Sequence, residues 1–113
     1  MRRAWLPLLL CVQGCTPGPL DAPSIDAWLG RWNGPEGTYL DIAAANGGYE
    51  ITIKDLDCAR TFSGVAAGDR IAFDRDGTNE SLLATDGDAT GMKWLAGKKN
   101  CLTIEPGEGY CRD

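Results

Sequence analysis

Short runs of alternating apolar and polar residues, separated by glycine-rich turns, dominate this sequence. In residues 49–54, tyrosine and isoleucine alternate with polar residues, as in a strand that buries one face and exposes the other. Ile71 and Phe73 repeat this spacing further along the chain. Such segments recur about every ten residues, which is typical of small β sandwiches and barrels. We therefore predict an all-β fold, a small antiparallel meander that closes into a barrel or forms a curled sheet.

Ahead of the strands, the sequence predicts a short N-terminal helix. Ser24 is a favourable N-cap, residues 25–29 can follow it, and Gly30 ends the segment. This helix is at most about two turns long, so we expect it to depend on packing against the strands. Near the other end of the chain, residues 92–96 fit either a strand or a single helical turn, and the sequence leaves both open.

Acidic residues and glycine meet at one predicted hairpin. Asp76 followed by Gly77 is the signal of a type I′ turn between two strands. Asp74, Asn79 and Glu80 lie close by and offer oxygen atoms of the kind that bind calcium. The spacing departs from the EF-hand pattern, because the glycine comes too early and the distant glutamate is missing. We therefore interpret these residues as a hairpin turn and predict no metal site.

Residues 1–15 have the arrangement of an export signal. Arg2 and Arg3 precede an apolar run that ends near Val12, and small residues follow it up to Cys15. A helix that spans a bilayer needs about 20 apolar residues, so this run is too short to be one. An ordinary secretory signal and a buried N-terminal helix are two interpretations of these residues, and the next motif adds a third.

The tetrad Val-Gln-Gly-Cys at residues 12–15 resembles the lipobox of bacterial lipoproteins. In that family a signal peptidase cuts just before the cysteine, which then carries acyl chains. The resemblance implies that residues 1–14 are a signal peptide and that Cys15 is lipidated. It also implies that the protein is anchored on the periplasmic side of the cell envelope. We expect the outer membrane, although the sequence itself does not distinguish it from the inner membrane.

The remaining chain divides into a tether and one domain. Residues 15–23 contain three prolines, a composition that favours an extended spacer of about 3.1 Å per residue. Residues 24–113 are predicted to form a single small β domain. Without Arg2 and Arg3, 9 basic residues face 16 acidic ones, a net charge of −7. We therefore expect no nucleic-acid partner, because phosphate neutralisation needs a basic surface.

Three of the five cysteines fall in the predicted β domain: Cys58, Cys101 and Cys111. Cys101 and Cys111 flank a Pro-Gly-Glu-Gly turn signal at residues 106–109, and such a hairpin brings its two ends together. We predict a Cys101–Cys111 disulfide that stabilises the fold by about 2–4 kcal/mol. A bond from Cys58 to either of the other two is the alternative, because connectivity does not follow from sequence alone.

Basic and aromatic residues gather in one segment of this acidic chain. Residues 90–100 contain Lys93, Trp94, Lys98 and Lys99. An exposed tryptophan among lysines can bind a partner through aromatic burial and charge. The same residues are explained equally well if Trp94 and its neighbour lie in the core and the lysines lie on a solvated turn. Both interpretations are open at this stage.

Catalysis has little support in the sequence. The chain has no histidine, so it lacks the usual catalytic pairs and the usual proton shuttle near neutral pH. It also has no Cys-x-x-Cys zinc motif and no glycine-rich phosphate loop. We predict that the protein is not an enzyme and uses no cofactor.

Two further resemblances bear on function. Gly30, Arg31 and Trp32 resemble the Gly-x-Trp start of lipocalin-type barrels, which implies a small apolar ligand inside a barrel. In size and signal architecture the chain is similar to small envelope lipoproteins that inhibit host lysozyme. In those proteins a loop comparable to residues 88–92 carries a tyrosine, and this chain has none in that loop. A terminal cysteine of those proteins corresponds to Cys111.

These observations predict a lipid-anchored envelope protein that acts as a non-catalytic binding module, with a periplasmic protein as its expected partner. The alternatives are a structural factor in envelope assembly or maintenance and a binder of small apolar ligands. A ligand cavity of roughly 300 Å³ or more would favour the small molecule, whereas a filled interior with Trp94 exposed would favour a protein partner. The oligomeric state does not follow from the sequence.

Overall fold

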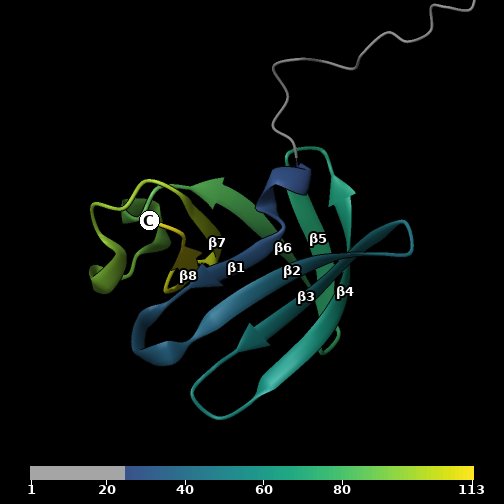
Figure 1. Ribbon diagram of the computed structural model, residues 1–113, viewed down its shortest axis with the longest axis horizontal. Coiled ribbons are helices and arrows are strands. Elements are labelled where there is room, and N and C mark those ends of the chain that lie inside the picture. Colours follow the sequence, from purple (N-terminus) through teal and green to yellow (C-terminus); the bar gives the residue numbers. More distant parts are fainter. Residues whose placement is uncertain (1–24) are drawn as a thin grey trace, which may run out of the picture.

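The computed structural model describes residues 25–113, which form an all-β domain (Figure 1). The predicted signal peptide at residues 1–14, the tether at residues 15–23, the lipidation site Cys15 and the N-cap Ser24 lie outside the described residues. The strands are β1 (Gly30–Asn33), β2 (Tyr39–Ala45), β3 (Gly48–Lys54), β4 (Ala59–Ala67), β5 (Arg70–Arg75), β6 (Thr78–Thr85), β7 (Cys101–Glu105) and β8 (Glu108–Cys111).

The strands form a closed barrel in which each strand pairs with the next in the chain. All neighbouring pairs are antiparallel, and β8 returns to pair with β1. The prediction of an antiparallel meander is therefore confirmed, and of its two forms the closed barrel is the one observed. Closure leaves a narrow seam, because β1 and β8 share a single residue pair, Asn33 with Cys111.

The structure does not confirm the predicted N-terminal helix. In its place the structure has one turn of 3-10 helix, η2 (Ile25–Trp28), closed by a bond from the Leu29 amide to the Asp26 carbonyl at 3.2 Å. A segment this short gains too few hydrogen bonds to offset the cost of nucleating an α-helix. Gly30 then adopts a φ of 109°, which ends the turn and starts β1.

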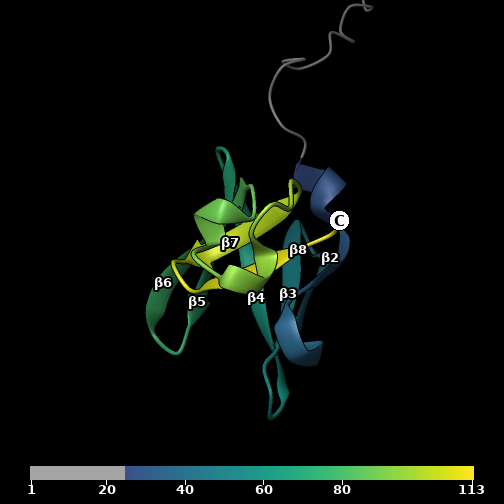
Figure 2. The same cartoon turned by 90° about the vertical axis from the view of Figure 1, so that its left-hand side faces the viewer.

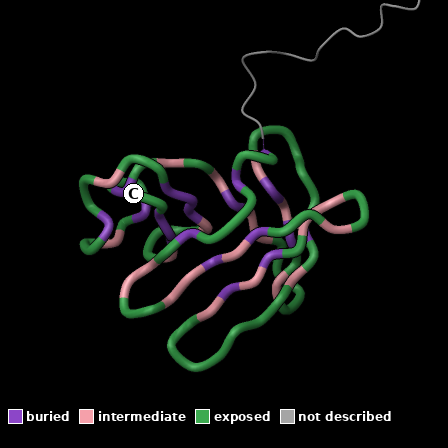
Figure 3. Tube along the Cα trace, viewed as in Figure 1, coloured by how far each residue is buried: buried purple, intermediate pink, exposed green. Residues whose placement is uncertain are grey.

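Alternation along the strands builds the core, as the purple and pink bands of the strands in Figure 3 show. In β3, Ile51 and Ile53 are buried and Tyr49 packs partly against the core, which confirms the period-two prediction. Full burial of one such aliphatic side chain stabilises the fold by about 1.5–3 kcal/mol. The core consists of Ile25, Trp28, Trp32, Leu40, Ile42, Ile51, Ile53, Ile71, Phe73, Leu82, Leu102 and Tyr110.

The hairpin at Asp76 and Gly77 has the predicted geometry. Both residues have positive φ, 56° and 85°, as a type I′ turn requires. The strands on either side then pair in register from Arg75 and Thr78 onward.

One end of the barrel is covered by η2 and fastened by Arg112. Its guanidinium donates hydrogen bonds to the carbonyls of Ala27, Trp28 and Leu29 and lies 4.0 Å from the centre of the Trp32 ring. The Trp32 indole N–H donates to the Trp28 carbonyl at 2.8 Å. Arg112 thus links the last strand, β8, to the chain just before the first strand, β1, and so reinforces the shortest ladder of the barrel.

The opposite end of the barrel holds a partly buried ionic cluster. The Arg75 guanidinium contacts the carboxylates of Glu108 at 2.7 Å and Glu80 at 3.0 Å. Hydrogen bonds to Glu108 and Glu80 raise the pKa of Arg75 against the opposing effect of burial. Because Arg75 lies two residues from the buried Phe73, its side chain faces the same interior side of β5.

Candidate binding surface

The segment that the sequence singled out lies on the long connection between β6 and β7, residues 86–100. Two single turns of 3-10 helix shape it, η4 (Asp88–Thr90) and η5 (Lys93–Leu95). The second turn settles the choice left open for residues 92–96 in favour of a helical turn. Figure 2 shows these green coils folded in front of β7 and β8.

Hydrogen bonds close this connection into a compact loop. The Gly87 amide donates to the Lys98 carbonyl at 2.8 Å, so the loop's two ends meet. The Asp88 carboxylate accepts from the Gly97 amide at 3.1 Å, which adds a second link across it. At Gly87 a Cβ atom would collide with the carbonyl oxygen of Leu95, so only glycine permits this approach.

Thr90 fixes the middle of the loop to the β7–β8 hairpin. Its side chain is fully buried, and its hydroxyl donates to the Gly87 carbonyl at 2.6 Å. Its own carbonyl accepts from the Gly107 amide at 2.8 Å. Sequence reasoning missed Thr90, because a threonine among glycine and acidic residues reads as an ordinary turn residue.

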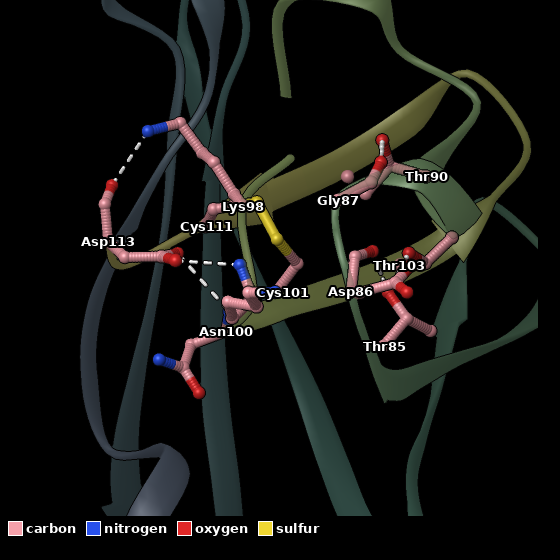
Figure 4. Close-up of a disulfide and its surroundings, with 12 residues drawn as sticks. Thr85, Asp86, Gly87, Thr90, Lys98, Asn100, Cys101, Thr103, Cys111 and Asp113 are labelled. Atoms are coloured by element: carbon pink, nitrogen blue, oxygen red, sulfur yellow. Dashed lines mark hydrogen bonds between the residues drawn. A yellow bond between two sulfur atoms is a disulfide. The ribbon is translucent and has the colours of Figure 1, made fainter. Parts of the chain in front are cut away.

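A second, small core lies under the loop. Cys101 and Cys111 face each other in register across the hairpin and form the predicted disulfide (Figure 4). Leu95 is buried against this disulfide, and Met92 packs beside it. Cys58 is exposed and free, so the alternative pairing through Cys58 is not the one observed. The disulfide therefore supports the loop as well as the hairpin.

Trp94 and Leu95 lie on opposite sides of η5. Trp94 is 71% exposed, more than any other large hydrophobic residue within residues 25–113. Leu95, by contrast, is 4% exposed. The interpretation in which both residues enter the core holds only for Leu95. The loop thus presents an indole ring to solvent from a backbone that is fixed underneath it.

The three lysines of the segment differ in their surroundings. Lys98 is half-buried, and its Nζ donates to the main-chain oxygen of Asp113 at 2.8 Å. Lys93 and Lys99 are exposed. The Asp113 carboxylate accepts from the main-chain amides of Lys99 at 2.6 Å and Asn100 at 3.2 Å (Figure 4). These hydrogen bonds lower the pKa of Asp113, and they hold the end of the loop next to β8.

Two of the three carboxylates considered for calcium, Asp76 and Glu80, form ion pairs. Asp76 contacts Arg60 at 2.5 Å, and Glu80 contacts Arg75. Each pair joins neighbouring parts of the barrel, which accounts for these acidic side chains without a metal.

Tyr110 is the buried ionisable group next to the interior cluster. Burial is the main cause that raises its pKa to about 12, and the negative charge of Glu108 adds to the effect. A phenol with this pKa stays neutral and protonated near pH 7, so it is poorly suited to exchange protons there.

The arrangement is suited to binding by apolar burial and charge, on a surface that we call the Trp94 surface: Trp94 and the adjoining Lys93. Within residues 25–113, no helix combines the length and apolar character needed to cross a membrane. No family model, curated protein sequence or solved structure matches the chain. Its function must therefore be argued from the geometry of this surface.

Proposed function

We propose that the protein is a lipid-anchored, non-catalytic binding module of the bacterial cell envelope that engages a periplasmic protein through the Trp94 surface. The observation that carries this proposal is the 71% exposure of Trp94 on a loop that is fixed from below. Tryptophan is among the residues that contribute most to protein interfaces, because its large ring buries much area in a partner's pocket.

The rigidity of the loop strengthens the argument. Binding by a flexible segment loses free energy to the ordering of backbone and side chains. Here Thr90, Leu95 and the Cys101–Cys111 disulfide hold the backbone around Trp94 before any partner arrives. The free energy gained by burying the indole is then available for affinity.

The barrel interior favours a protein partner over an enclosed apolar ligand. Leu40, Ile51, Ile71, Leu82 and Leu102 all have 0% exposure and fill the centre of the barrel. The depressions found among residues 25–113 are open to solvent, and the one of about 540 Å³ lies at the η2 end of the barrel, where Trp28 and Trp32 form part of its wall. A ligand of the lipocalin kind would need this core to be displaced.

The membrane anchor belongs to the same proposal. A cysteine after a small-residue cleavage site is the signal for lipidation, and the proline-rich segment that follows Cys15 would hold the barrel about 25 Å from the lipid. Such a tether leaves the Trp94 surface free to meet proteins in the periplasm.

The test is a pull-down from envelope extract with immobilised protein. The wild type is compared with Trp94→Ala and with Leu56→Ala, a control at a 65% exposed apolar residue between β3 and β4. We expect Trp94→Ala to lose the captured protein, with a binding free energy weaker by about 2 kcal/mol or more once that protein is purified. Leu56→Ala should bind normally. Equal capture by all three proteins would overturn the proposal.

A further inference from the structure

The basic side chains of residues 25–113 have an ion-pair or hydrogen-bond partner in every case except Lys93 and Lys99. All five arginines within residues 25–113 contact an oxygen atom, and Lys54 and Lys98 each donate to a main-chain oxygen. In this part of the chain, Lys93 and Lys99 are the basic residues whose side chains have neither an ion pair nor a hydrogen bond. The arginine partners are Asp41 for Arg31, Asp76 for Arg60, Asp69 for Arg70, Glu80 and Glu108 for Arg75, and main-chain carbonyls for Arg112.

Lys99 also borders a groove with a volume of about 540 Å³. The groove runs between η2 and the start of β7, and Trp28 and Trp32 form part of its wall. Lys99 and Arg112 are its charged lining residues, and Asn100 adds an amide. None of its lining residues is acidic, although acidic residues outnumber basic ones in the chain by 16 to 11.

The two cations of the groove have complementary properties. Arg112 is fixed in place by the η2 carbonyls and the Trp32 ring, so its charge stays at one position. Lys99 is exposed and unpaired, so its ammonium can move to meet a ligand. The Asp113 carboxylate lies beside the groove, where it accepts hydrogen bonds from the Lys99 and Asn100 amides, and Lys98 donates to the main-chain oxygen of the same residue. Three cations, Lys98, Lys99 and Arg112, thus stand against this one side-chain carboxylate, and the field in the groove favours an anion.

We propose that this groove receives an acidic segment of the partner protein, with a carboxylate between Lys99 and Arg112 and an apolar side chain against Trp28. The inference rests on the proposed function and specifies the chemistry of the partner. Trp94 provides apolar contact, and the groove selects for negative charge. A flat lipid surface fits less well, because its head groups cannot follow a concave groove.

The experiment is an NMR titration of the ¹⁵N-labelled protein with a capped hexapeptide of alternating glutamate and leucine. The same peptide with glutamine in place of glutamate is the matched control ligand, since it keeps the shape and removes the charge. We expect the glutamate peptide to shift the amide signals of Lys99, Asn100 and Arg112 and to bind about tenfold more tightly than the glutamine peptide.

Variants of two lysines locate the site. Lys99→Gln should weaken binding of the glutamate peptide about tenfold, whereas Lys54→Gln, at the opposite end of the barrel, should leave it unchanged. Equal binding of the two peptides, or equal effects of the two variants, would overturn the inference. So would shifts at the same amides produced only by phosphatidylglycerol vesicles, since these would assign the groove to a membrane. Each of these results leaves the Trp94 pull-down as a separate test of the proposed function.

Discussion

At the scale of single residues, Trp94 and Leu95 show how one helical turn separates binding from stability. Leu95 is buried against the disulfide, so Leu95→Ala should leave a cavity and lower the free energy of unfolding by about 2–3 kcal/mol. Trp94→Ala should change it by less than about 0.5 kcal/mol, because the ring is exposed. Urea denaturation of both variants measures the difference. A Leu95→Ala protein as stable as the wild type would contradict the assignment of a core under the loop.

The raised pKa of Tyr110 predicts how the stability of the fold changes in alkaline solution. Its pKa is about 12 in the folded protein and about 10 in an unfolded chain, so the unfolded state loses its proton first. The native state then binds more protons, and stability must fall as the pH rises. We expect a loss of about 2–3 kcal/mol between pH 10 and pH 12, measured by denaturation at several pH values.

The matched control for this effect is Tyr110→Phe. The variant keeps the buried ring and removes the ionisable group, so this part of the alkaline loss should be absent from it. Wild type and variant with the same slope of stability against pH would show that Tyr110 is not the group responsible.

At the scale of elements, the Cys101–Cys111 disulfide links β7 to β8 and supports the loop that packs on it. Cys101→Ser combined with Cys111→Ser should lower the free energy of unfolding by about 2–4 kcal/mol. Because Leu95 packs on the disulfide, the loop amides should also exchange with deuterium faster. Cys58→Ser is the control, since Cys58 is exposed and free. If the double variant accelerated exchange no more than Cys58→Ser does, the disulfide would not support the loop.

The elements also show how far sequence reasoning reached. Alternation predicted β3 and β5, and Asp76 with Gly77 predicted a hairpin, because these signals depend on local geometry alone. The short helix failed because four residues form too few hydrogen bonds to offset the cost of nucleating an α-helix, and because the turn also packs against Arg112, which lies 85 positions along the chain from Ala27. The exposure of Trp94 could not be predicted either. It depends on which face of η5 meets the disulfide.

At the scale of the whole molecule, the proposed lipid anchor predicts where the protein is found. Cys15→Ser should abolish acylation and release the protein from the membrane fraction, because a single cysteine would carry the whole lipidation signal. Fractionation of cells followed by mass spectrometry of the purified protein measures both effects. Cys58→Ser serves as a control that leaves the lipidation signal intact. A Cys15→Ser variant that stays on the membrane and still carries lipid would contradict the lipoprotein assignment.

The narrow seam between β1 and β8 bears on the order of events as the chain folds. All other strand pairs join consecutive strands, and isolated hairpins form in about 1–10 μs. The seam instead depends on contacts such as that of Arg112 with Leu29, 83 positions away, so it carries the largest loss of chain entropy and should form last. Until then β1 and β8 are open edges that another molecule could extend. We therefore expect the docking of Arg112 onto the residues before β1 to close the barrel, and so to end the period in which its edge strands are most exposed to aggregation.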